Sequence, residues 1–493
     1  MHTSPWLMAR PKGSNTKLAV QRRHGPIKAE RKDHMTPQVM GLHNITSHLL
    51  KTVTQLPNPA NRILLGINAN PNLVLGRAYE RYGRFLRNHY HAFDNVPQLL
   101  EAVNRAIGDV PYYHDLYGGR QIASRDEFEK AIGFIDKDTI LANAGRFVSG
   151  TINLSDYDTG TTGGTSGKPL TFIAPKSRYV VELATMHSLW ARAGYDFDVR
   201  AVIRNHRLPT NRDHIINPLT REVIFDGFQL TADYFAKIYQ IMRRYRIRFI
   251  HCYPSTAYEF ATFLHQRELD TTFITAFLSG SENIFDYQRE LIQKQLGIRF
   301  YNWYGHSEKV VLAGYCEGSD NYHVEPTYGY FELVDSDGHV IRKPGAIGEI
   351  VGTSLHNVGM PLIRYRTGDF AEYVGDYCGA CGRHLPLIRH IRGRWSGDRI
   401  YNADGTFVTT TALNLHNDLY QVISGMQYLQ ERKGELTVLV VRSAKYTTGD
   451  EERLYMHFRR RLNTDTVVTI QYVDRLMRKS NGKFVHIISS VDA

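Results

Sequence analysis

The stretch Asp158-Thr-Gly-Thr-Thr-Gly-Gly-Thr-Ser-Gly-Lys-Pro169 is the most informative part of the chain. Its glycines free the backbone to turn N–H groups toward an anion, its Thr and Ser hydroxyls add donors, and Lys168 adds positive charge. Such a loop suits a triphosphate. It is not a Walker A loop, because that motif requires Gly where Thr162 stands and Ser or Thr where Pro169 stands. The sequence therefore argues against a P-loop kinase or ATPase.

The segments around this loop predict an α/β fold. Residues 40–148 have apolar residues at helical spacing, and the loop lies between two short β-like runs, 146–154 (RFVSGTINL) and 169–175 (PLTFIAP). Further along, the helical pattern of 231–246 alternates with short apolar runs such as 248–254, 275–280 and 298–305. Strands separated by helices indicate βαβ units and a largely parallel sheet.

The pattern changes again toward the C-terminus. Residues 328–391 read as an all-β region, rich in alternating strands and turns. After Arg394 we expect a small α+β unit, with a hairpin over 426–442, an amphipathic helix over 450–462 and a strand over 467–473.

Composition and charge limit the class of protein. The chain has 493 residues, of which 42% are hydrophobic and 22% charged, and no run of about 18 apolar residues that would span a membrane. Four cysteines are too few for a disulfide scaffold, so we expect a cytoplasmic protein. The net charge is +11, and residues 1–35 contribute +6 of it. We interpret this part as a solvated, disordered tail, although a transit peptide or a true start at Met35 or Met40 would explain it equally well.

Five further motifs follow the glycine-rich loop in a fixed order. They are Ser279-Gly-Ser-Glu282, Tyr304-Gly-His-Ser-Glu308, Tyr365-Arg-Thr-Gly-Asp369, Arg392-Gly-Arg394-Trp-Ser-Gly-Asp398 and Lys479-Ser-Asn-Gly-Lys483. In this order the set resembles the adenylate-forming superfamily, and within it the phenylacetate–CoA ligase and CapK-like branch. The resemblance covers about residues 80–490. Each motif alone would more often be a surface acid or a turn, so the ordered combination carries the prediction.

The resemblance implies an α/β fold with a large N-terminal adenylate-forming domain of mixed sheets and helices, and a small mobile α+β C-terminal domain. The expected division is a basic tail at 1–39, the adenylation domain at 40–393, a hinge at 394–398 and the mobile domain at 399–493.

The resemblance also implies a function: ATP- and Mg²⁺-dependent activation of a carboxylic acid to an acyl adenylate, then transfer to an acceptor, by default CoA. Lys483, Glu308 and Arg394 are the expected catalytic residues, with Glu308 also holding Mg²⁺, a cation that prefers carboxylate oxygen. The expected ATP-binding residues are Thr162, Gly163, Gly164, Thr165, Ser166, Gly167, Lys168, Ser281, Glu282, Tyr304, Gly305, Ser307 and Asp369.

Three cysteines form a second group of candidate ligands. Cys378-Gly-Ala-Cys381 is a CxxC sequence, and Cys316 lies just beyond the Glu308 motif. Some phenylacetate–CoA ligase relatives hold a structural zinc near here. Tetrahedral Zn²⁺ needs a fourth ligand, for which His323, Cys252 or His251 are candidates. The alternative is a set of reduced cysteines that hold no metal.

Several alternatives remain open. An amine or a sugar hydroxyl could replace CoA as the acceptor, as in CapK-like enzymes of surface-polysaccharide or natural-product assembly. A rival of another class is a zinc-containing, non-enzymatic nucleic-acid-binding protein, although we expect no nucleic-acid partner. His306, Trp303, Tyr253 and Trp190 could line an acyl or aryl pocket, or could be core residues. The sequence leaves the acid and the oligomeric state open.

Overall fold

A computed structural model of the chain describes residues 56–66, 70–161, 170–393, 399–409, 422–477 and 486–491, with Leu413, Leu415 and Leu419. The tail at 1–39, the predicted phosphate loop at 162–168, the hinge residues Arg394 and Asp398, and Lys483 lie outside the described residues. Predictions that concern them remain predictions.

The first described part of the chain is helical, as predicted. Six helices follow one another, and their bounds are α2 Asn58–Gly66, α3 Pro71–Asn88, α4 Val96–Asp109, α5 Pro111–Tyr117, α6 Arg125–Ala131 and α7 Lys137–Ala142. Local caps begin the last two: Ser124 accepts a hydrogen bond from the Glu127 amide, and Asp136 accepts one from the Thr139 amide. Gly76 interrupts α3 with a φ of 83°. The Asp136 cap starts α7 directly at Lys137, a residue of the cavity described below.

The run at 146–154 was predicted as β-like, and this prediction is wrong. A 3₁₀ turn over Ala144–Arg146 and another over Leu154–Asp156 bracket an irregular segment. The Ser149 and Gly150 amides donate to the carbonyls of Gly359 and Asp109. These partners lie in a loop and a helix terminus, so the segment forms no ladder. The first strands are β1 (Tyr157–Thr161) and β2 (Thr171–Pro175), an antiparallel pair on either side of the glycine-rich loop.

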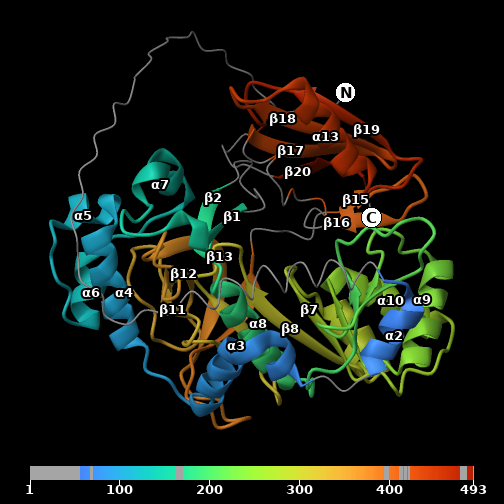
Figure 1. The fold of residues 1–493 in the computed structure, drawn as a ribbon, viewed down its shortest axis with the longest axis horizontal. Helices are drawn as coiled ribbons and strands as arrows, with labels where there is room; N and C mark the ends of the chain where they lie inside the picture. Colours follow the sequence, from blue (N-terminus) through green and yellow to red (C-terminus); the bar gives the residue numbers. More distant parts are fainter. Residues whose placement is uncertain are drawn as a thin grey trace.

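A sheet of twelve strands organises the large domain (Figure 1). Its order is β11-β12-β13-β14-β10-β9-β8-β7-β6-β3-β5-β4. The bounds are β3 Arg200–Ile203, β4 Ile215–Asn217, β5 Glu222–Phe225, β6 Phe249–Cys252, β7 Ala276–Gly280, β8 Arg299–Gly305, β9 Leu312–Tyr315, β10 Tyr322–Val324, β11 Gly329–Val334, β12 Ile347–Ser354, β13 Tyr365–Gly375 and β14 Leu387–Arg392.

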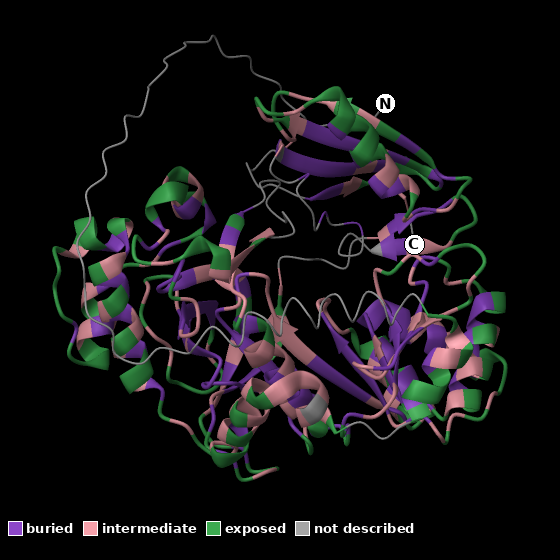
Figure 2. Ribbon diagram, viewed as in Figure 1, coloured by how far each residue is buried: buried purple, intermediate pink, exposed green. Residues whose placement is uncertain are grey.

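The sheet has a parallel half and an antiparallel half. Strands β5, β3, β6, β7 and β8 run parallel, as the alternation of helices and strands predicted. From β8 onward through β11 every pairing is antiparallel, in agreement with the all-β region predicted at 328–391. Helices α9 (Ala232–Tyr245) and α10 (Pro254–Gln266) cover the parallel half, and α8 (Arg178–Ala191) packs against α3. Figure 2 shows the buried strands in both halves.

The small C-terminal domain is an α+β unit, as predicted. Strands β15 (Arg399–Tyr401) and β16 (Phe407–Thr409) form a short pair. The main sheet has the order β19-β18-β17-β20, with bounds β17 Ile423–Arg432, β18 Glu435–Arg442, β19 Val467–Tyr472 and β20 Ile487–Ser489. Helix α13 (Thr448–Arg459) buries Leu454 and Phe458 against this sheet.

The two domains touch beside the carboxyl ends of the parallel strands. Phe228 and Tyr253 of the large domain belong to the same apolar cluster as the core of the small domain. The Arg207 side chain donates a hydrogen bond to the backbone carbonyl of Arg460. These contacts hold the small domain beside the carboxyl ends of the parallel strands (Figure 1). Among the described residues, no helix is long and apolar enough to cross a membrane.

Candidate active site

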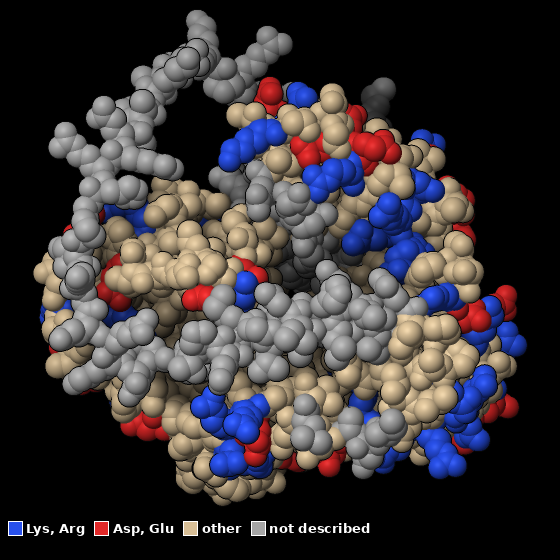
Figure 3. Space-filling model, viewed as in Figure 1, with Lys and Arg blue, Asp and Glu red and all other residues tan. Residues whose placement is uncertain are grey.

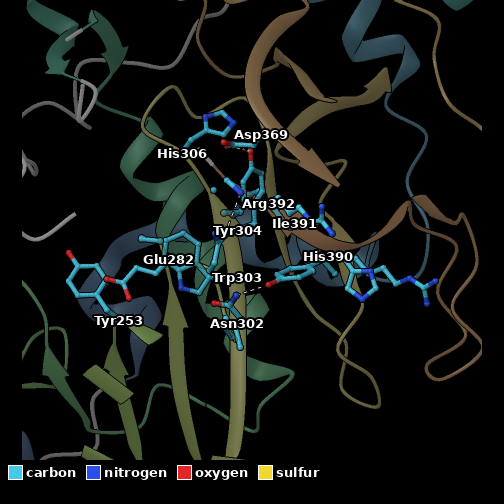
Figure 4. Close-up of a pocket in the computed structure, with 18 of the residues that line it drawn as sticks. Tyr253, Glu282, Asn302, Trp303, Tyr304, His306, Asp369, His390, Ile391 and Arg392 are labelled. Carbon is cyan, nitrogen blue, oxygen red and sulfur yellow. Dashed lines mark hydrogen bonds between the residues drawn. The ribbon is translucent and has the colours of Figure 1, made fainter. Parts of the chain in front are cut away.

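A cavity of about 1020 Å³ opens at the carboxyl ends of the parallel strands. The described residues that line it are 281–286, 302–309, 320–322 and 389–393, with Lys137, Glu182, Arg204, Asn205, Tyr253, Arg289, Leu312, Tyr328 and Asp369. In open α/β sheets, ligands bind in a crevice at this end of the strands. Figure 4 shows Asp369 and His306 at one end of the cavity, and Tyr253 across it from His390.

The strand order explains why these residues meet. Arg204, Tyr253, Ser281 and His306 each come directly after a parallel strand, β3, β6, β7 and β8 respectively. Neighbouring parallel strands end at the same edge, so the four side chains reach one cavity from four separate parts of the sequence.

Glu308 is a buried carboxylate at the end of the segment that follows β8. The Tyr365 hydroxyl donates to its Oε1 at 2.8 Å, and His306 Nδ1 lies 3.5 Å from its Oε2. Burial alone would raise the pKa of Glu308, but His306 and Tyr365 favour the charged form and lower the pKa to about 2. Glu308 is therefore an ionised oxygen ligand inside the cavity, which is what a Mg²⁺ ion requires.

Asp369 lies on β13, near the same end of the cavity. Tyr304, the predicted ATP-binding aromatic residue, donates its hydroxyl to Asp369 Oδ2 at 2.8 Å. Burial and the charge of Asp369 hold the pKa of Tyr304 well above its ordinary value, so the phenol stays a donor. The Asp369 amide donates to Thr367 Oγ1 at 3.1 Å. These bonds fix a carboxylate that can accept hydrogen bonds from two neighbouring hydroxyls of a ligand.

Ser281 and Glu282 form a strained turn after β7. Ser281 has a φ of 71°, a left-handed conformation that a serine rarely adopts. Glu282 Oε2 accepts a hydrogen bond from the Ser255 amide at 3.0 Å, in the first turn of α10. The carboxylate thus ties the turn to a helix N-terminus, where a negative charge is stabilised.

The Trp303 ring packs on the backbone that precedes this turn. A Cβ atom at Gly280 would lie 2.5 Å from the indole, so only glycine allows this close approach. Trp303 and Tyr253 line the cavity. Trp190 is buried at 3% exposure in the core and is absent from the described lining.

The structure thus brings together the described part of the predicted site. Ser281, Glu282, Tyr304, Gly305, Ser307, Glu308 and Asp369 all line the cavity. Thr162–Lys168, Arg394 and Lys483 lie outside the described residues. Lys137 and Arg204 also line the cavity, and sequence reasoning missed both. The rule that ligands bind after parallel strands could have found Arg204, whereas no comparable signal marks Lys137 at the start of a short helix.

A second polar cluster consists of residues outside the described cavity lining. One ligand atom each of Cys316, His323, Cys378 and Cys381 lies within 4.8 Å of the others. His323 is therefore the fourth candidate ligand that the fold selects. Cys252 instead lies beside Ser279 in the sheet, and His251 contacts Arg204.

The spacing of this cluster fits a tetrahedral metal. The Sγ atoms of Cys316 and Cys378 are 3.7 Å apart, and Cys381 Sγ lies 3.4 Å from His323 Nε2. Zn–S bonds of about 2.3 Å in a tetrahedron place two sulfurs about 3.8 Å apart. Arg383 supports the neighbouring loop by pairing with Glu317. Three thiols and an imidazole at these distances are a suitable donor set for structural zinc.

Comparisons with known proteins agree with this architecture. Residues 400–490 match the CapK C-terminal domain. A phenylacetate-coenzyme A ligase of Thermus thermophilus is 26% identical over 201 residues, 40% of this chain and 45% of that protein. A phenylacetate-coenzyme A ligase of Pseudomonas putida is 29% identical over 160 residues, 31% of this chain and 36% of that protein. The chain thus spans less than half the length of these curated relatives.

The fold is shared with solved structures. A 2-hydroxyisobutyryl-CoA ligase in an open conformation with 2-HIB-AMP and CoA has a TM-score of 0.51 and 16% identity, over 80% of this chain and 90% of that chain. The same ligase in the thioesterification state also has a TM-score of 0.51, with 17% identity, over 80% and 88% of the two chains. These likenesses confirm the predicted fold class. The resemblance that the sequence motifs indicated agrees with the CapK domain match and the phenylacetate-coenzyme A ligase relatives.

Proposed function

We propose that this chain, which carries a CapK C-terminal domain on the fold of the acyl-CoA ligases of the adenylate-forming superfamily, activates a carboxylic acid with ATP and transfers the acyl group to CoA. One observation carries the proposal: a single cavity gathers an ionised Glu308, an oriented Asp369 and the Ser281–Glu282 turn. The motifs that contribute them lie more than twenty residues apart in sequence. A surface acid or a plain turn would have no reason to converge on this cavity.

The first step needs little help from a base. A substrate carboxylate is already ionised at pH 7, so its oxygen can attack the α-phosphorus of ATP directly. The new bond joins the carboxylate oxygen to phosphorus, and the bond from the α-phosphorus to the bridging oxygen of pyrophosphate breaks. Catalysis then consists mainly of placing two anions together and stabilising the charge that develops.

The cavity residues suit these tasks. Asp369 would accept hydrogen bonds from the two ribose hydroxyls of ATP, with Tyr304 holding its other side. Glu308 would hold Mg²⁺, which would neutralise phosphate charge when bound. The glycine-rich loop at 162–168 would contact the β- and γ-phosphates, and Lys483 would contact the α-phosphate and the substrate carboxylate.

The second step requires a change of access. The proposed hinge at 394–398 would let the domain at 399–493 rotate away from the domain at 40–393, so that Lys483 withdraws and the acceptor enters. The proposed acceptor is the CoA thiol. Figure 3 shows basic side chains along the boundary between the two domains, where polyanions such as ATP and CoA would be attracted. Since a cell supplies ATP, Mg²⁺ and CoA in its cytoplasm, we place the reaction there.

The CapK C-terminal domain favours a second acceptor class. An amine or a sugar hydroxyl could attack the same adenylate in place of CoA, with AMP leaving in either case. The domain match at residues 400–490 is the observation in favour of this variant, because the acceptor enters beside that domain.

We also propose a structural zinc ion at Cys316, His323, Cys378 and Cys381. The spacing of the four donors supports this assignment. Zinc would fasten the loop at 376–384 to the β9–β10 hairpin, which leads from the Glu308 segment. It would have no part in acid activation.

The test is acid-dependent release of pyrophosphate from ATP and Mg²⁺ over a panel of aryl and acyl acids. We expect activity with at least one acid and its near-loss in Lys483→Ala. Adding CoA, amines or sugars to the active acid would then identify the acceptor by the product formed. If the whole panel is silent and ATP gives no thermal stabilisation, the proposal is wrong.

A further inference from the structure

Arg204 is a cation inside the cavity, and its partners among the described residues are all neutral. It follows β3 directly, and its Nη1 donates to His251 Nε2 at 2.8 Å while its Nη2 donates to Ser281 Oγ at 3.1 Å. Its guanidinium also stacks on the Tyr253 ring, with Cζ 4.2 Å from the ring centroid. Burial and the charge of Arg204 hold the pKa of His251 well below its ordinary range, so the imidazole is an uncharged acceptor.

Three other cations that line the cavity each pair with a carboxylate. Arg289 pairs with Asp286 and Asp320, Lys309 pairs with Glu182, and Arg389 pairs with Glu372. Within the described ranges, no carboxylate oxygen lies within 4.0 Å of the Arg204 guanidinium. The nearby Glu282 is turned toward the amide of Ser255 at the start of α10. Arg204 is therefore oriented by the fold while its charge is not neutralised by these neighbours.

The remaining donors of Arg204 have a defined chemistry. A guanidinium has five N–H donors, and two serve His251 and Ser281. The other three have no partner among the residues that the structure describes. A planar fork of donors matches the two oxygens of a carboxylate or the oxygens of another oxyanion. A half-buried cation also gains more from an anionic partner here than in bulk water.

Arg204 lies several strands away from the Glu308 end of the cavity, although its hydrogen-bond partner Ser281 belongs to the predicted ATP-binding turn. In the sheet order β8-β7-β6-β3, strands β6 and β7 lie between its strand and that of Glu308. With about 4.8 Å between neighbouring strands, the ends of β3 and β8 are about 14 Å apart. Figure 4 shows Tyr253, the ring under Arg204, well away from Asp369. An acid activated near Glu308 would extend along the strand ends toward Arg204.

We propose that Arg204 binds a second anionic group on the acid that is activated, so that the preferred substrates carry two acidic groups. This inference rests on the proposed function and names the substrate class of the same cavity. The first group of such an acid is adenylated, and the second stays ionised against the guanidinium fork. Acids with an apolar far end would leave the Arg204 charge without a partner.

The experiment compares matched acids by pyrophosphate release. Benzoate is set against isophthalate, terephthalate and 4-sulfobenzoate, and hexanoate and octanoate against adipate and suberate. The dicarboxylate and sulfonate arms distinguish a carboxylate site from a general oxyanion site. Each acid is measured with the wild type, Arg204→Gln, Arg204→Lys and Arg389→Gln. Arg389 is the control, because it also lines the cavity but is paired with Glu372.

We expect the wild type to prefer a diacid over its neutral partner in kcat/KM. Arg204→Gln should lower kcat/KM for the diacid by about 10- to 100-fold, as for the loss of a charge-assisted hydrogen bond, and spare the neutral acid. Arg204→Lys should retain part of the preference, and Arg389→Gln all of it. A preference for neutral acids, an equal loss for both kinds, or a change confined to the KM for ATP would overturn the inference. Silence with every acid would instead contradict the proposed function itself.

Discussion

Arg364 and Arg204 are both set into the large domain, but the chain treats their charges in opposite ways. Arg364 makes a forked pair with Glu332 at 3.2 and 2.9 Å and also donates to the carbonyls of Glu129 and Ile132. Its side chain is 3% exposed. Arg204 contacts a neutral imidazole, a hydroxyl and an aromatic ring, and faces a cavity.

The difference separates structural charges from functional ones. A buried ion pair with satisfied donors is costly to break and has nothing left to offer a ligand. A charge that the fold orients but does not neutralise keeps its capacity for a ligand. The predictions below test this division.

The largest expected effect follows from breaking the buried pair of Arg364 and Glu332. Arg364→Met removes one partner of a buried pair and leaves the Glu129 and Ile132 carbonyls unsatisfied, so we expect the free energy of unfolding to fall by about 3–5 kcal/mol. Urea denaturation measures it. Arg105→Met removes a surface partner of Glu101 and should change stability by less than about 1 kcal/mol.

A double variant distinguishes the cost of an unpaired buried charge from the cost of the lost side-chain volume. Replacing both members, as Arg364→Met with Glu332→Leu, removes the unpaired charge and should recover part of the lost stability. If the double variant were less stable than Arg364→Met alone, the carboxylate would not be the source of the cost.

Loss of the cavity carboxylate of Asp369 should affect activity more than stability. Asp369→Ala removes the carboxylate that we expect to accept two ribose hydroxyls, so kcat/KM for ATP in pyrophosphate release should fall by about 100-fold. Thermal unfolding should change little. Asp337→Ala, at an exposed position on another loop, is the matched control and should leave both unchanged. An Asp369→Ala enzyme with normal kinetics would remove this residue from the site.

The sequence predicted the convergence of the motifs better than the residues that surround them. Glu308 and Asp369 stand in ordered motifs, and the resemblance of that order to the adenylate-forming superfamily implied that they belong to one site. Arg204 belongs to no motif, and it reaches the cavity only because β3 lies beside β6 in the sheet. Strand order is a property of the whole fold, which is why a local reading of the sequence missed this residue.

The choice of the fourth candidate ligand in the cysteine cluster also depends on strand order, which the local sequence does not show. His323 was one of three candidates, and the choice depends on pairings that bring β10 between β9 and β14. The residues 146–154 show the converse: their alternation looked like a strand, but the neighbouring backbone partners belong to a loop and a helix end. Periodicity predicts an element only when a partner strand is available.

The zinc ion that we propose at the cysteine cluster should be lost when one of its ligands is replaced. Cys378→Ser should lower the zinc content of the purified protein to a small fraction of that of the wild type. The free energy of unfolding should fall by about 2 kcal/mol or more, since loss of a structural metal is among the large effects. Elemental analysis and thermal unfolding measure the two quantities. Cys252→Ser, a buried thiol outside the cluster, should keep its zinc; wild-type protein without zinc would contradict the assignment.

The smallest expected effect concerns His356, a buried histidine whose imidazole the fold keeps uncharged. His356 Nε2 lies 2.8 Å from the Thr327 carbonyl and must donate to it, because a carbonyl only accepts. Burial and the charge of Arg178 lower the pKa of His356 from 6.5 to about 4. The folded state thus keeps the imidazole neutral, while the unfolded chain takes up a proton below about pH 6.5. The stability that His356 contributes is complete above that pH and is lost as the pH falls toward 4.

The corresponding variant isolates this one group from the other buried histidines. Between pH 7 and pH 5.5, protonation of His356 in the unfolded chain should cost the wild type about 1.2 kcal/mol of unfolding free energy. His356→Gln keeps an N–H donor for Thr327 but does not titrate, so its pH dependence should be shallower by about that amount. Equal slopes for His356→Gln and the wild type in urea denaturation would mean that His356 is protonated in the folded protein as well. The uncharged state that we assign to His356 beside the Thr327 carbonyl would then be wrong.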